Sequence, residues 1–202
     1  DENNQPWTGF KEGRTVAPAT EGSEVQTIVS YAFALEGITE EEEAVMENLA
    51  DVLGMESSPY IQKMNERLPA AQAVVGLLNR DLGKDPTLIF QMLGADDGDE
   101  DEFKAIVDET IAEILENGVD QESLAAICQN RRFSVELGND NPSRGLSFAE
   151  DAITRWAHDG DVKAYQTEYE VFNKLGEYVE NDAFDAIFKK YMTSPARSVL
   201  LA

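Results

Sequence analysis

The spacing of apolar residues changes several times along the chain, and each change marks a predicted element. From residue 25 to residue 35, β-branched and aromatic side chains alternate with smaller or more polar ones, which is the pattern of a strand. Two shorter apolar runs, residues 71–78 and 88–93, are separated by aspartate, glycine and proline and predict two further strands joined by a turn. Residues 198–201 predict a closing strand.

Two helices carry clear start signals. Thr39 with Glu42 forms a capping box, and the helix that follows ends at Gly54. Ser58 and Pro59 suit the N-cap and the first residue of a short second helix.

Four more helices are predicted from apolar residues that recur every three or four positions. They cover about residues 99–117, 120–137, 143–157 and 182–192. Leu115 belongs to the expected apolar face of the first of these, and Cys128 and Phe133 belong to that of the second.

The order of elements predicts the fold class. A strand, two helices, two strands, about four helices and a strand are grouped rather than strictly alternating, which indicates an α+β fold with two layers. We expect a largely antiparallel sheet packed against helices. Residues 1–22 are polar and show no period, so we expect a lead-in segment or linker there and one domain over residues 23–202.

Charge narrows the partners that the chain can have. Of the 202 residues, 16 are lysine or arginine and 40 are aspartate or glutamate, so the net charge is −24. A field of that sign repels phosphate backbones and anionic headgroups, which argues against nucleic acid and membrane partners. No run of apolar residues is long enough to span a bilayer, and the first residues lack the features of a signal peptide. A cytoplasmic location is the default expectation, with any upstream signal peptide outside this sequence.

The counts of cysteine and histidine limit the chemistry. The chain has one cysteine, Cys128, and one histidine, His158, too few for an internal disulfide or a Cys/His zinc cluster. His158 is close to Asp159 and Asp161, which could orient it as a general base, but no Gly-x-Ser-x-Gly motif supplies a nucleophile. A surface or helix-capping histidine is therefore the favoured interpretation.

Other charged motifs also have structural interpretations. Asp97, Asp99 and Asp101 have the spacing of the first ligands of an EF-hand loop, but Glu102 and Asp108 stand where that loop requires glycine and glutamate. Carboxylates that favour a helix start explain the run better. The basic pairs at 131–132 and 189–190 are expected to be solvated helix faces, and glycine-rich phosphate loops are absent from the sequence.

A family resemblance emerges between about residues 122 and 161. It is carried by a Phe-Ser pair, a Pro-Ser-Arg-Gly-Leu-Ser segment, a tryptophan and a Gly-Asp turn, namely Phe133, Ser134, Pro142, Arg144, Gly145, Leu146, Trp156, Gly160 and Asp161. This block resembles one in the presequence-protease branch of the pitrilysin/insulinase zinc peptidases, although His158 replaces the usual tyrosine and Val162 the usual proline. Segments 29–33, 57–60 and 194–199 are similar to other parts of that branch, in the same order.

The resemblance implies a non-catalytic role. In that family four homologous α/β domains form a clamshell, and the His-x-x-Glu-His zinc motif lies in the first domain, whereas this chain resembles the second. The resemblance therefore implies a pitrilysin/insulinase-like fold without catalytic, cofactor-binding or metal-binding residues, in which the nine residues above are structural. Zinc would be bound by the upstream domain of the parent protein. One histidine also cannot supply the two imidazoles of that motif.

The leading hypothesis is a structural or substrate-chamber domain excised from a large zinc metallopeptidase that degrades peptides, inactive alone. Its expected partners are the catalytic upstream domain, the C-terminal half and the parent's peptide substrate. Acidic walls would favour basic or neutral peptides. We expect Arg144 and Gly145 to set a helix-start geometry, with Arg144 paired to an acid across a domain contact.

Two alternatives stay open at this stage. The first is a free-standing acidic protein-interaction module of the same fold without peptidase activity. The second is an enzyme that uses His158 with Asp159 or Asp161.

Overall fold

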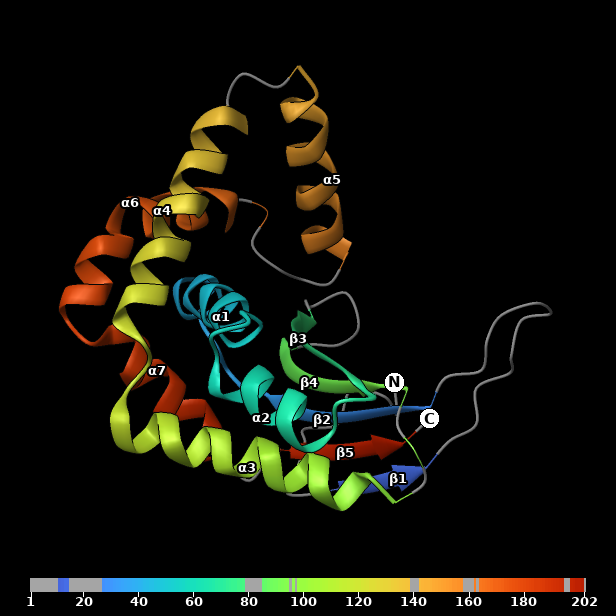
Figure 1. The fold of residues 1–202 in the computed structure, drawn as a ribbon. Coiled ribbons are helices and arrows are strands. Elements are labelled where there is room, and N and C mark those ends of the chain that lie inside the picture. Colours follow the sequence, from blue (N-terminus) through green and yellow to red (C-terminus); the bar gives the residue numbers. More distant parts are fainter. Residues whose placement is uncertain are drawn as a thin grey trace.

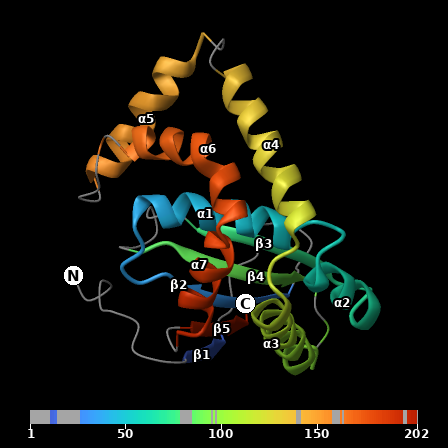
Figure 2. The same cartoon turned by 90° about the vertical axis from the view of Figure 1, so that its left-hand side faces the viewer.

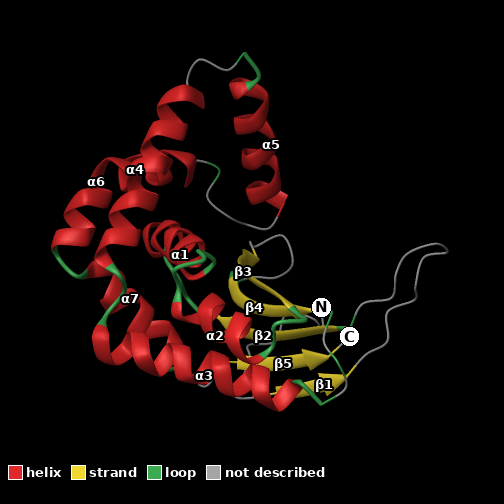
Figure 3. Cartoon of the chain, in the orientation of Figure 1, coloured by secondary structure: helices red, strands yellow, loops and turns green. Residues whose placement is uncertain are grey.

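The computed structural model contains one mixed sheet and a set of helices (Figures 1 and 3). It describes residues 11–14, 27–78, 85–94, 96, 98–138, 142–157, 162, 164–194 and 197–201. The strands are β1 (Lys11–Arg14), β2 (Ile28–Ala34), β3 (Gln72–Leu78), β4 (Thr87–Leu93) and β5 (Arg197–Leu201). The helices are α1 (Glu40–Leu53), α2 (Pro59–Arg67), α3 (Glu100–Asn117), α4 (Gln121–Gly138), α5 (Arg144–Ala157), α6 (Ala164–Glu180) and α7 (Ala183–Met192).

The strands lie in the order β1-β5-β2-β4-β3. Strand β2 pairs antiparallel with both β4 and β5, and β3 pairs antiparallel with β4, which confirms the largely antiparallel sheet. The exception is β1, which runs parallel to β5. This strand lies inside the segment 1–22, where the polar sequence predicts a linker, so at least Lys11–Arg14 belongs to the sheet. Pairing with a distant strand, rather than local β-propensity, explains β1.

One face of the sheet forms the hydrophobic core. Tyr31 and Phe33 of β2 and Phe90 of β4 are almost completely buried beneath the covering helices. Tyr31 lies opposite Phe90 in the strand register. The ring of Phe90 meets that of Phe33 edge to face at 6.0 Å and that of Tyr60 from α2 at 5.1 Å. These contacts tie α2 to the middle of the sheet.

The predicted start signals of α1 and α2 are confirmed. The backbone N–H of Glu42 donates to the Thr39 hydroxyl at 3.2 Å, and the Thr39 N–H donates to the Glu42 carboxylate at 3.2 Å. The Ser58 hydroxyl accepts from the N–H of Ile61 at 3.2 Å, and Pro59 is the first residue of α2. The predicted strands and the other predicted helices are present with bounds close to those expected. Leu115, expected on the apolar face of α3, is instead 37% exposed.

Helices α4 to α6, here called the helical arm, extend beyond the sheet and its covering helices. In Figures 1 and 2, α4 and α5 rise away from the sheet and α6 returns toward α7. The sequence pattern did not predict α6, although Tyr165, Tyr169, Phe172 and Leu175 have helical spacing. Aromatic and β-branched residues together with Gly176 lower the intrinsic helix propensity of this segment.

Acidic side chains of α1 attach the later helices. Arg155 of α5 donates to Glu40 at 2.6 Å, and Arg131 of α4 donates to Asp51 at 2.7 Å. Lys190 of α7 donates to Glu42 at 2.6 Å. Arg131 and Lys190 are therefore ion-paired across helices; Lys189 and Lys190 are also exposed, as the sequence predicted, whereas the Arg131 side chain is about one-third exposed (31%). Among the described residues, no helix combines the length and the apolar character that crossing a bilayer requires.

Candidate functional site

Within the described residues, no three histidine, cysteine, aspartate or glutamate side chains gather as a metal site would require. Cys128 lies buried on the inner side of α4, and burial raises the pKa of its thiol, which disfavours a reactive thiolate. The candidate base His158 and its neighbour Asp159 lie outside the described residues, as does Asp97 of the acidic run. Among the described residues, the candidates singled out from the sequence thus include neither a metal cluster nor an activated thiol.

The acidic run before α3 has the structural role that the sequence favoured. The Asp99 carboxylate accepts from the backbone N–H of Asp96 at 3.0 Å, and the Glu100 carboxylate accepts from that of Gly98 at 2.8 Å. These bonds hold the turn that leads into the helix.

The outer face of the sheet, on the side away from the core, differs from the rest of the molecule. Alternation along the paired strands β2, β3 and β4 places the following residues on it: Ile28, Ser30, Ala32, Ala34, Gln72, Val74, Gly76, Thr87, Ile89, Gln91 and Leu93. The two alanines are buried and the others are at least partly exposed. None of these residues is charged, although the chain carries a net charge of −24. The Gln91 amide donates to the Ser30 hydroxyl across this face at 3.0 Å.

Strand β3 borders the outer face with an open edge. Among the described residues it pairs only with β4, so the backbone groups along its other edge have no strand partner. Gly76 lies in the middle of β3, and a Cβ atom added there would meet no other atom within 4 Å. An open strand edge is the element onto which an extended peptide can add as a further strand.

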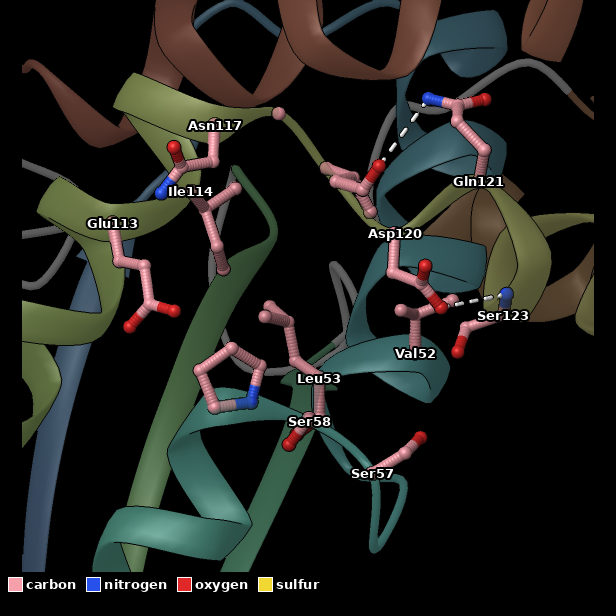
Figure 4. A pocket seen from close by; sticks show the side chains of 13 residues that line it. Val52, Leu53, Ser57, Ser58, Glu113, Ile114, Asn117, Asp120, Gln121 and Ser123 are labelled. Carbon is pink, nitrogen blue, oxygen red and sulfur yellow. Dashed lines mark hydrogen bonds between the residues drawn. The ribbon is translucent and has the colours of Figure 1, made fainter.

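A pocket of about 460 Å³ lies where α1, α2, α3 and α4 meet (Figure 4). Two of the polar side chains that line it, Ser58 and Asp120, have partners within the fold. The Ser58 hydroxyl donates to the carbonyl of Leu53 at 2.6 Å, and the Asp120 carboxylate accepts from the N–H of Ser123 at 2.9 Å. The side chain and backbone of Ser123 lower the pKa of Asp120, which is consistent with a stable helix cap. The pocket is best explained as the space left where the ends of four helices pack together.

The residues that carry the family resemblance lie on the helical arm. Phe133 and Ser134 are exposed on α4, although Phe133 was expected on the apolar side of that helix and is in fact 60% exposed. The apolar stripe of α4 includes Leu124 and Cys128, and Phe133 points away from it because it is five residues beyond Cys128.

The other described residues that carry the resemblance lie at the two ends of α5. Pro142 is exposed just before the helix, Arg144, Gly145 and Leu146 form its first turn, and Trp156 lies in its last turn. The guanidinium of Arg144 lies 4.9 Å from the centre of the Phe148 ring, a cation–π contact within the helix. Gly160 and Asp161 lie outside the described residues. The described signature residues are therefore spread over α4, the segment before α5 and both ends of α5.

The sequence model of the family called Peptidase M16 inactive domain matches residues 2–131, which is more than half of the chain. The chain belongs to this family. The match covers the sheet, apart from β5, and the first helices, so the fold and the family agree. The recognition of an inactive pitrilysin/insulinase-type domain from sequence is confirmed.

Curated relatives of this M16 inactive domain are much longer proteins. The mitochondrial presequence protease of Xenopus tropicalis is 26% identical over 140 residues, which cover 68% of this chain and 13% of that protein. Protein HypA of Clostridium perfringens is 25% identical over 104 residues, 51% of this chain and 11% of that protein. The chain thus spans about an eighth of the length of these relatives.

Solved structures share the fold. The inactive peptidase domain of a candidate zinc protease from Bordetella parapertussis superposes with a TM-score of 0.69 at 14% identity, covering 89% of this chain and 93% of that one. A protease from Helicobacter pylori also gives 0.69 at 14% identity, covering 98% of this chain but only 45% of that one. The same fold therefore makes up nearly all of one solved chain and about half of another.

Sequence reasoning missed the outer sheet face and the open edge of β3. A signal was present, because every second position of the 25–35 run, apart from Ile28, is small or polar, and Thr87 and Gln91 alternate with buried residues of β4. The order of the strands decides which edge is open, and no local pattern encodes that order.

Proposed function

We propose that this M16 inactive domain is a non-catalytic wall of the substrate chamber in a larger zinc-dependent peptidase. It holds peptide in an extended form, and a separate domain of the same polypeptide binds zinc and hydrolyses the peptide. The other domains of that polypeptide are its permanent partners.

The outer face of the sheet, bordered by the open edge of β3, is the observation that carries this proposal. Main-chain hydrogen bonds to a strand edge do not depend on the side chains of the added peptide, so they suit a peptidase with many substrates. The uncharged residues beside the edge impose no charge requirement on the peptide lying over them. Small residues such as Gly76 leave room for its side chains.

The proposed substrates are basic and neutral peptides. The net charge of −24 attracts cationic peptides over a distance, while the uncharged face receives them at contact. The name of the Xenopus relative, a mitochondrial presequence protease, supports this class, because mitochondrial targeting sequences are rich in arginine.

Hydrogen–deuterium exchange tests the proposal on the 202-residue chain. Two unstructured peptides of equal length, one rich in arginine and one rich in glutamate, are added in turn. We expect the arginine-rich peptide to slow amide exchange in β3 and to leave α3 unchanged, and the glutamate-rich peptide to have a much weaker effect. Unchanged exchange in β3 with saturating arginine-rich peptide would overturn the proposal and favour an interaction module of the same fold.

A variant sharpens this test. Gly76→Trp adds a large side chain beside the β3 edge, at a position where an added Cβ would meet no other atom within 4 Å. We expect it to weaken binding of the arginine-rich peptide by about tenfold, equivalent to about 1.4 kcal/mol. Gly145→Trp, on the exposed surface of α5, is the matched control and should leave peptide binding unchanged. Equal affinities for the two variants would contradict a site at β3.

A further inference from the structure

Helix α5 carries an exposed apolar stripe. Leu146, Ile153 and Trp156 are 62%, 63% and 72% exposed, and Ala149 between them is also exposed. Large apolar side chains exposed singly are common on protein surfaces, but a row of them on one helix marks an interaction site.

The spacing of these residues places them on one side of the helix. Positions 146, 149, 153 and 156 follow the intervals three, four and three, which is the spacing of a coiled-coil seam over two heptads. Such a seam packs against another helix, because knobs at these positions enter holes formed by residues with the same spacing.

The opposite side of α5 is the one that faces the rest of the molecule. Arg155 is paired there with Glu40 of α1, and both side chains are largely buried. The residues one and two helical turns before it, Ala152 and Phe148, are less exposed than Leu146, Ile153 and Trp156. The contact of Arg155 with α1 thus sets which side of α5 faces the rest of the molecule. Figure 2 shows α5 away from the sheet. The stripe is therefore presented outward by the fold.

We infer that the stripe of Leu146, Ala149, Ile153 and Trp156 is the docking surface for a helix from another domain of the same polypeptide. The inference rests on the proposed function, in which this chain is one domain of a larger peptidase, and it names the surface of contact. The chain spans 13% of the Xenopus protease and 45% of the Helicobacter pylori protease, so most of each longer chain is available to supply that helix.

Charge argues against the other occupants. Two copies of a chain with a net charge of −24 repel each other, and the same charge repels an anionic bilayer. A domain joined covalently to this one is held at high effective concentration, so a stripe of four residues is sufficient for it. The expected partner is an apolar helix face with basic residues at its margins.

Cysteine labelling compares the stripe in the 202-residue chain and in the full-length polypeptide that contains it. Ile153→Cys places a thiol in the stripe, and Ser147→Cys places one on an exposed part of α5 outside it. The native Cys128 is buried and its peptide is read separately by mass spectrometry. We expect Cys at position 153 to react with a maleimide at least about tenfold more slowly in the full-length polypeptide than in the 202-residue chain. Cys at position 147 should react at similar rates in both.

Each other outcome overturns the inference. Equal rates at position 153 in the two proteins would show an uncovered stripe. Protection in the 202-residue chain that grows with its own concentration would identify a second copy as the occupant, and protection by anionic vesicles would identify a membrane. Chelator-sensitive peptide hydrolysis by the wild-type full-length polypeptide is measured in parallel. If the full-length polypeptide hydrolyses peptide but position 153 is not protected from maleimide, only the docking surface is rejected. If the full-length polypeptide does not hydrolyse peptide, the proposed function itself is rejected.

Discussion

The sheet with its covering helices and the helical arm are held together in different ways. Between the sheet and helices α1, α2, α3 and α7, large apolar side chains are completely buried, and aromatic rings from separate elements meet. In the described part of the chain, the arm adds fewer buried side chains, among them Leu124 and Cys128 of α4 and Leu175 of α6, is also tied to α1 by ion pairs, and leaves the apolar stripe of α5 exposed. The core is thus centred on the sheet and its covering helices, α4 and α6 join it through one side, and α5 carries the exposed apolar side chains.

The largest expected contrast between the two regions comes from two phenylalanine substitutions. Phe90→Ala removes a ring that is fully buried between Phe33 and Tyr60 and should lower the free energy of unfolding by about 3–5 kcal/mol. Phe133→Ala, on the exposed side of α4, should change it by about 0.5 kcal/mol or less. Urea denaturation measures both. Similar losses in the two variants would contradict the division into core and arm.

The next largest effect on stability is expected at the joint between the two regions, the loop from α3 to α4. Gly118 connects α3 to α4 with φ of 82° and ψ of 170°, a conformation that residues other than glycine rarely adopt. An added Cβ would also lie 3.1 Å from the Asp185 carboxylate, which accepts from the N–H of Val119 at 2.7 Å. Gly118→Ala should therefore destabilise the fold by about 1–3 kcal/mol.

Gly145→Ala is the matched control for that joint. Gly145 is in the first turn of α5, and an added Cβ would meet no other atom within 4 Å. Alanine should leave stability unchanged or raise it by about 0.5–1 kcal/mol, because it reduces the freedom of the unfolded chain. Thermal denaturation of both variants measures the two changes in stability. A loss of stability in Gly145→Ala as large as that in Gly118→Ala would contradict a specific need for glycine at position 118.

A smaller effect tests the attachment of the arm. Arg155→Met removes the ion pair with Glu40 and keeps the aliphatic packing of the side chain. We expect a loss of about 1–2 kcal/mol, with faster amide exchange in α5 and unchanged exchange in α3. Lys63→Met, which removes a pair with Glu113 between α2 and α3, is the control and should leave α5 unchanged. Faster exchange throughout the chain in Arg155→Met would contradict a separately attached arm.

The smallest effect is a pH dependence from the pairing of α1 with α7. Burial raises the pKa of Glu42, but hydrogen bonds from Lys190, Tyr191 and the Thr39 backbone outweigh this, so its pKa lies below the ordinary 4.5. A lowered pKa in the folded state stabilises the protein above the ordinary value, and this contribution is lost as the pH falls through the folded value. Urea midpoints from about pH 6 down to about pH 3 should therefore fall less steeply for Glu42→Gln than for the wild type. Parallel pH profiles would contradict the role of Glu42.

The elements predicted well from sequence are those whose signals are local. The capping box of Thr39 and the Ser58-Pro59 pair predict the starts of α1 and α2 without any tertiary contact. The spacing of apolar residues likewise predicts α3 and α7. Strand β1 was missed because only its pairing with β5, almost two hundred residues away, makes it a strand.

The candidate site was predicted less well for a physical reason. Helical spacing alone assigned Phe133 to a buried face, but only a partner surface decides whether an apolar residue is covered, and here it is exposed. The nine signature residues remain a prediction as structural positions, and the open edge of β3 depends on strand order, which the sequence pattern does not encode. The boundary predicted at residues 22–23 also remains a prediction.

Peptide hydrolysis tests the central claim most directly. An arginine-rich peptide is incubated with zinc and the 202-residue chain, and separately with zinc and the full-length polypeptide, each with and without a chelator. The account predicts no cleavage by the chain alone and chelator-sensitive cleavage by the full-length polypeptide. Cleavage by the purified 202-residue chain would contradict it and would direct attention to His158.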